Sequence, residues 1–107
     1  HYPLRRQRQM CIRDSPKSSL AVARVPPGVT TQLHRLSGTE ETYIIKRGSG
    51  TLEIDGEKSE LQLGDAIIIP AGASQKISNT GHEDLEFFCL CTPRFLPECY
   101  ENLEEQN

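Results

Sequence analysis

Residues 28–48, GVTTQLHRLSGTEETYIIKRG, decide the fold that we predict for this chain. The stretch begins and ends on glycine, and it carries one histidine, His34, and a glutamate seven residues later, Glu41. A second stretch, residues 64–79, GDAIIIPAGASQKISN, follows further along the chain. Both contain β-branched runs bounded by glycine, proline or asparagine, which is typical of short strands between turns. Together they predict a small β-barrel with one polar pocket.

The same rhythm of short strands and turns extends from Ser18 to Thr92. Seven or eight β-rich segments recur about every ten residues, with glycine or proline in nearly every turn, which is the spacing of a β-sandwich or barrel. Asp55-Gly56 predicts a two-residue hairpin turn, because both central positions of such a turn need positive φ. After these strands, Pro97 is expected to open a short helix that runs through Leu103.

Length and composition exclude several classes of protein. A chain of 107 residues fits one compact domain. The net charge of −3 provides no basic surface for a nucleic acid or an anionic membrane. No apolar run approaches the roughly twenty residues of a membrane helix, so we expect a cytoplasmic protein. Cys89 and Cys91 share one face of a strand, where we expect small side chains, one or both of them buried, in a reducing compartment.

The first fifteen residues, HYPLRRQRQMCIRDS, differ from the rest in composition. The stretch is basic and shows no strand or helix pattern, and RQMCIRDS resembles a translated linker sequence. We therefore expect residues 1–15 to be a non-native or disordered arm, and we assign the folded domain to residues 16–107.

The two stretches resemble the two motifs of the cupin superfamily, G(x)5HxH(x)3,4E(x)6G and G(x)5PxG(x)2H(x)3N. The matching positions of the first motif are Gly28, His34, Glu41 and Gly48, and those of the second are Gly64, Pro70, Gly72 and Asn79. Every spacing is kept. The resemblance implies an all-β, single-domain cupin, a jelly-roll β-barrel, here with a short C-terminal helix.

Two of the four positions that bind metal in such cupins differ here. The second histidine of the pattern is Leu36 and the third is Gln75, so that only His34 and Glu41 match residue by residue. The C-terminal CTPRFLPECYENLE also resembles a subgroup of small bacterial cupins that is called mannose-6-phosphate isomerase-like.

Strand alternation sorts the side chains without reference to the family. Gln32 and His34 share one strand face, Glu41 and Tyr43 share another, and Gln75 belongs to a later strand. If His34 points into the barrel, these five side chains line the pocket within an apolar wall. Few polar groups among many apolar ones are typical of a small-molecule site. We expect Gln32 and Gln75 to bind ligand.

Three interpretations of this pocket remain open. In the first, His34, Glu41 and Gln75 hold one divalent ion, such as zinc, iron, manganese or nickel, although Gln75 is a weak ligand. In the second, no metal binds. A carboxylate next to His34 then favours its protonated form, and the pair moves a proton while Tyr43 donates to an oxyanion. In the third, His34 and Glu41 only bond to each other as the remnant of a lost site.

Two functions follow from these interpretations. One is an enzyme that acts on a sugar or carboxylic acid as an isomerase, epimerase, lyase or dioxygenase, with His34, Glu41 and Tyr43 as catalytic residues. The other is a metal-free, non-catalytic cupin that binds a small ligand. In either case the exposed strand edges and the resemblance to cupins favour a homodimer formed by sheet pairing.

Overall fold

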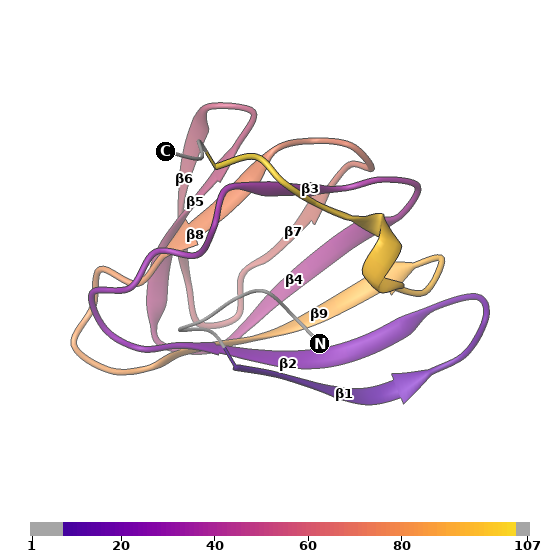
Figure 1. The fold of residues 1–107 in the computed structure, drawn as a ribbon. Helices are drawn as coiled ribbons and strands as arrows, with labels where there is room; N and C mark the ends of the chain where they lie inside the picture. The colour runs from indigo at the N-terminus through magenta and orange to yellow at the C-terminus, as the bar shows by residue number, and fades with distance from the viewer. Residues whose placement is uncertain (1–7, 105–107) are drawn as a thin grey trace.

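Two five-stranded antiparallel sheets face each other in the computed structural model, which describes residues 8–104 (Figure 1). Sheet A has the order β1 (Arg8–Asp14), β2 (Ser19–Val25), β9 (Leu85–Thr92), β4 (Glu40–Arg47), β7 (Ala66–Ile69). Sheet B has the order β10 (Tyr100–Asn102), β3 (His34–Leu36), β8 (Gln75–Ser78), β5 (Ser49–Ile54), β6 (Glu57–Gln62). The predicted all-β jelly roll is confirmed.

The strands form where apolar residues alternate with polar or half-exposed ones. In β9 every second residue is buried, beginning with Leu85 and Phe87, and β2 alternates in the same way. Successive side chains of a strand point to opposite faces, so this period of two places one row of each strand between the sheets. Cys89 and Cys91 belong to that inward row and are buried, as expected.

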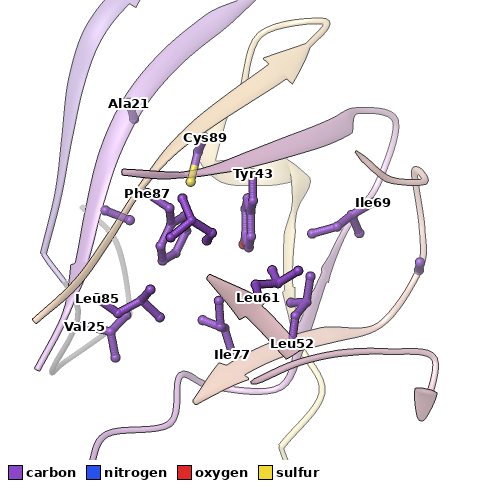
Figure 2. Close-up of a cluster of buried hydrophobic side chains, with 13 residues drawn as sticks. Ala21, Val25, Tyr43, Leu52, Leu61, Ile69, Ile77, Leu85, Phe87 and Cys89 are labelled. Atoms are coloured by element: carbon purple, nitrogen blue, oxygen red, sulfur yellow. The ribbon is translucent and has the colours of Figure 1, made fainter. Parts of the chain in front are cut away.

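The core fills the space between the two sheets (Figure 2). Phe87 is its largest fully buried side chain, and the Phe87 ring packs against Tyr43 with 4.5 Å between the ring centroids. Burial of one such side chain contributes roughly 1.5–3 kcal/mol to folding. The buried cluster comprises Ala21, Ala23, Val25, Tyr43, Ile45, Leu52, Leu61, Ile69, Ala73, Ile77, Leu85, Phe87 and Cys89.

The last glycine of the first motif is required by backbone packing. Gly48 has a φ of 78°, and a Cβ at this position would lie 2.6 Å from the carbonyl oxygen of Asp84. A side chain therefore meets both an unfavourable backbone conformation and a steric clash. The expected hairpin turn at Asp55-Gly56 is also confirmed: both residues have positive φ, and they join β5 to β6.

Residues 8–14 differ from the sequence prediction of a disordered arm. They form β1, which pairs with β2 along its whole length, with a bulge between Cys11 and Arg13. An unpaired strand edge offers its N–H and C=O groups to any extended segment nearby, whatever the composition of that segment. Residues 1–7 of the expected arm lie outside the described residues, and its non-native origin stays a prediction.

The C-terminal segment also departs from expectation. Only Pro97–Cys99 are helical, as one 3₁₀ turn, and the predicted helix through Leu103 is replaced by the strand β10. β10 pairs with β3 because β3 is otherwise the edge of sheet B. Within the first motif, residues 30–36 form a strand only at their end, over His34–Leu36. None of the helical structure in residues 8–104 is long and apolar enough to cross a membrane.

Candidate functional site

The inner faces of three strands bring the predicted site residues together. His34 on β3 and Gln75 on β8 are direct cross-strand partners in sheet B, and Glu41 and Tyr43 lie on β4 in sheet A. All four side chains are buried, with at most 5% of their surface exposed. The alternation that predicted their inward orientation is therefore confirmed.

Gln75 connects the two sheets through hydrogen bonds. Its amide nitrogen donates to Glu41 Oε1 at 2.6 Å, and its Oε1 accepts a bond from the Tyr43 hydroxyl at 2.7 Å. A buried amide of this kind is satisfied on both its donor and acceptor sides. The Tyr43 hydroxyl, expected to face an oxyanion, donates to Gln75 instead.

Cys91 completes the surroundings of Glu41. The thiol is the direct cross-strand partner of Glu41 in sheet A and donates to Glu41 Oε2 with an S···O distance of 3.8 Å. Burial, followed by the charge of Glu41, raises the Cys91 pKa to about 12, so the thiol stays protonated and remains a donor. The sequence analysis identified Cys91 as buried but assigned it no contact with the site.

Burial dominates the acidity of Glu41. It raises the pKa of this carboxyl from 4.5 to about 7, although the hydrogen bonds from Gln75 and Cys91 act in the opposite direction. A carboxylate leaves water at high cost, and two weak donors offset only part of that cost. Glu41 therefore exchanges its proton near neutral pH, as a general acid or base would.

His34 is held apart from Glu41. Its Nδ1 lies 2.7 Å from the backbone carbonyl oxygen of Gln32, so Nδ1 carries the proton and donates it. Its ring stacks on Tyr100, with 4.8 Å between centroids. Burial lowers the His34 pKa, and the bond to Gln32 only partly opposes this effect. The expectation that Glu41 keeps His34 protonated is wrong, because burial dominates the His34 pKa and the ring bonds to Gln32 rather than to Glu41.

The third interpretation, a direct bond between His34 and Glu41, is also wrong. Within residues 8–104 His34 bonds to Gln32, whereas Glu41 bonds to Gln75 and Cys91. Gln75, whose side chain bonds to Glu41, is the cross-strand neighbour of His34.

Gln32 and Tyr100 form the more exposed side of the site. The Tyr100 hydroxyl donates to Gln32 Oε1 at 2.7 Å, and both residues are half-buried. Tyr100 was missed by the sequence analysis, which placed it in a helix. The strand β10 has only three residues, which is too short for a strand pattern to show in the sequence, and it forms by pairing with β3.

The donor set does not fit a metal ion. In the part of the chain that the structure describes, no three His, Cys, Asp or Glu side chains are close enough to share one ion. Leu36, at the position of the second histidine, is apolar and buried. Gln75 directs its amide N–H toward Glu41, and an ion there would have to displace that bond.

Two packed antiparallel sheets that enclose a cluster of polar side chains define a jelly-roll β-barrel. The family model described as "Cupin domain" matches residues 21–91, and the chain belongs to the cupin family.

Relatives of known sequence agree with this assignment. The chain is 42% identical over 88 residues to an uncharacterized protein of Methanocaldococcus jannaschii, covering 82% of this chain and 70% of that protein. It is 36% identical over 67 residues to an oxalate-binding protein of Thermotoga maritima, covering 63% of this chain and 55% of that protein. The chain thus spans about half of the length of this second relative.

Solved structures share the same architecture. A predicted oxalate decarboxylase from Thermotoga maritima superposes with a TM-score of 0.76 and 28% identity, over 81% of this chain and 80% of that one. A conserved protein with a double-stranded beta-helix domain from Klebsiella pneumoniae superposes with a TM-score of 0.83. That match, at 19% identity over 94% of this chain and 87% of the other, concerns the fold alone.

Proposed function

We propose that this chain is a metal-free cupin that binds a small carboxylic acid beside His34 and Glu41. One observation carries the proposal. The Glu41 carboxyl accepts hydrogen bonds from Gln75 and Cys91 and has a pKa of about 7. A bound proton can therefore neutralise this carboxylate in place of a metal ion. Such a carboxyl can present a hydroxyl donor to an anionic ligand at neutral pH.

The neutral His34 ring supplies the complementary group. Because Nδ1 donates to the Gln32 carbonyl, Nε2 is the ring's acceptor and can accept a hydrogen bond from a hydroxyl group of a ligand. A carboxylate, the form that a small carboxylic acid takes at neutral pH, offers an acceptor for the Glu41 hydroxyl. The similarity to an oxalate-binding protein and to a predicted oxalate decarboxylase supports the same ligand class.

Oxalate binding measured by calorimetry at several pH values tests this function. The bound anion adds negative charge beside Glu41, so binding requires the protonated carboxyl. Above pH 7, affinity should therefore fall by up to about tenfold for each rise of one pH unit. Glu41→Gln should bind with little pH dependence above pH 7. A wild-type affinity that is constant from about pH 6 to pH 9 would refute the role of Glu41.

Metal content tests the metal-free part of the proposal. Protein purified without chelator should contain less than about a tenth of an equivalent of transition metal. The matched control is Leu36→His combined with Gln75→His, which restores the cupin ligand pattern and should bind zinc stoichiometrically. A stoichiometric metal in the wild type, lost in His34→Ala, would overturn the proposal.

That outcome would favour the second candidate, a metal-assisted isomerase, epimerase, lyase or dioxygenase. One observation supports it: a histidine that donates from Nδ1 to a backbone carbonyl has the orientation of many metal ligands. The resemblance of residues 91–104 to the mannose-6-phosphate isomerase-like subgroup adds sugar phosphates to the compounds to be screened. Thermal shift with sugars and small acids distinguishes the two ligand classes.

A further inference from the structure

The polar site is closed to solvent in this structure. His34 is 5% exposed and Glu41 is 3% exposed, so a ligand can reach them only if part of the surrounding wall moves. The strands β4 and β8, which carry Glu41 and Gln75, are each paired with a strand on both sides. In contrast, β10 is the edge of sheet B and pairs with β3 over three residues. Moving β10 therefore breaks one short set of pairings, whereas moving β4 or β8 breaks two.

The strand β10 also carries the ring that covers His34. The Tyr100 ring lies on the imidazole with 4.8 Å between centroids and 15° between the ring planes. The Tyr100 hydroxyl donates to Gln32 Oε1 at 2.7 Å. Departure of Tyr100 would thus uncover one face of His34 and free a hydrogen-bond acceptor of Gln32.

Residues 93–104, which we call the C-terminal strap, follow β9 and end beside β3 (Figure 1). The beginning of the strap is attached to buried groups. The Thr39 hydroxyl donates to the carbonyl oxygen of Pro93, and the Phe95 backbone N–H donates to Ser19 Oγ at 2.9 Å. Thr39 and Ser19 are both buried. The beginning of the strap is therefore fixed to the barrel.

The far end of the strap is attached by groups that solvent reaches. Glu101 accepts two hydrogen bonds from the Arg35 guanidinium, both at 3.0 Å, and these side chains are 50% and 42% exposed. The Glu104 carboxylate accepts a bond from the Leu33 backbone N–H at 2.6 Å. Exposed ion pairs contribute little to stability and weaken with salt. Segments attached mainly by exposed contacts open locally while the rest of the fold stays intact.

We propose that the far end of the C-terminal strap, residues 100–104, is a gate that moves away from β3 and admits a ligand to His34, with the Arg35–Glu101 ion pair as its latch. Residues 93–96 stay attached, and the 3₁₀ turn Pro97–Cys99 lies between the fixed part and the moving part. The gate rests on the proposed function, because it serves a ligand that binds beside His34.

Chemical modification of His34 by diethyl pyrocarbonate measures this opening without any ligand. The reagent acylates neutral imidazole, and burial lowers the His34 pKa, so the ring is reactive at neutral pH once it is uncovered. Peptide mass spectrometry distinguishes His34 from His82, which is exposed and serves as the internal reference. His34 should react at least about tenfold more slowly than His82. Its rate should change little at urea concentrations below the unfolding transition, because local opening exposes little surface.

Variants of the latch and of the ring test the two parts of the gate. Glu101→Gln should raise the His34 rate about threefold, as expected for the loss of one exposed ion pair. Glu86→Gln is the matched control, because it breaks an ion pair with Lys46 of 3.1 Å on sheet A, and it should keep the wild-type rate. Tyr100→Ala uncovers the ring directly and should raise the rate at least about tenfold.

Salt and oxalate complete the experiment. Added sodium chloride should raise the His34 rate in the wild type but not in Glu101→Gln, because salt screens the latch. Saturating oxalate should protect His34 if the proposed function is correct. Loss of this protection alone would overturn the carboxylic acid function and still support the opening of the strap. A His34 rate that Glu101→Gln leaves unchanged, or one that rises with urea as global unfolding does, would overturn the gate.

Discussion

Replacing Glu41 by glutamine should remove a pH dependence of stability that this one carboxyl produces. Glutamine keeps the Oε1 that accepts the bond from Gln75, and it places an amide where Oε2 meets Cys91. The variant therefore imitates the protonated glutamic acid in shape and hydrogen bonding, and it cannot ionise. The buried pair of Glu41 and Gln75 loses little packing in this exchange.

The magnitude follows from the Glu41 pKa. Below pH 4.5 both the folded and the unfolded chain hold the proton, and Glu41 contributes no pH dependence. As pH rises from 4.5 to about 7, the unfolded chain releases its proton while the folded protein keeps it. The free energy of unfolding therefore falls. Since the pKa rises from 4.5 to about 7, the loss is about 3 kcal/mol and is complete above about pH 7.

His34 acts with the opposite sign. Its pKa is lowered by burial, so the unfolded chain takes up a proton first as pH falls below 6.5. The stability that His34 contributes is present above that pH and is lost at lower pH. In the wild type the two groups partly cancel between pH 4.5 and 6.5. The difference between wild type and Glu41→Gln isolates the Glu41 part, because both proteins retain His34.

Urea denaturation from about pH 4.5 to pH 8 measures this difference. The two proteins should be about equally stable at the acidic end, and Glu41→Gln should be about 3 kcal/mol more stable at the alkaline end. Thermal midpoints should differ there by roughly 12 °C or more. Glu57→Gln changes an exposed carboxyl on β6 and should keep the wild-type profile. Parallel curves for wild type and Glu41→Gln would refute the reasoning.

Two further predictions concern packing. Gly48→Ala should destabilise by about 2 kcal/mol or more, whereas Gly28→Ala should cost only about 1 kcal/mol: both have positive φ, but only Gly48 places a Cβ against backbone. Equal losses in urea denaturation would contradict this. Tyr100→Phe keeps the stacking on His34 and loses the bond to Gln32, so it should cost about 1 kcal/mol. Tyr100→Ala loses both contacts and should cost about 2 kcal/mol, and an Ala variant as stable as the Phe variant would contradict the stacking.

The sequence predicted the strands and the inward side chains because both depend on local periodicity, whereas the jelly-roll topology was implied by the resemblance to the cupin motifs. The sequence from Gly28 to Gly48 predicts a strand, a turn and a second strand. The alternation of side chains within each strand then predicts that His34 and Glu41 point inward. These properties need no knowledge of which strands pair. The same holds for the Asp55-Gly56 hairpin, since its turn residues are adjacent in the chain.

The partners of each side chain were not predictable, because they depend on long-range register. Cys91 meets Glu41 only because β9 pairs with β4 in one particular alignment. Tyr100 reaches His34 because the last strand adds to the edge of sheet B. The direction of the His34 pKa shift also needed the structure, since it depends on how completely the ring is buried rather than on Glu41.

Gln75 accounts for the dependence of the Glu41 charge on pH. A buried carboxylate such as Glu41 needs a nearby positive charge or must take up a proton. Gln75 stands where the cupin pattern has a histidine, and it supplies a neutral N–H that satisfies Glu41 Oε1 without balancing the charge. Leu36 is apolar and offers no charge to balance that of Glu41. A bound proton is then what neutralises the carboxylate, which accounts for a Glu41 pKa of about 7; under the proposed function, it also makes ligand binding depend on pH.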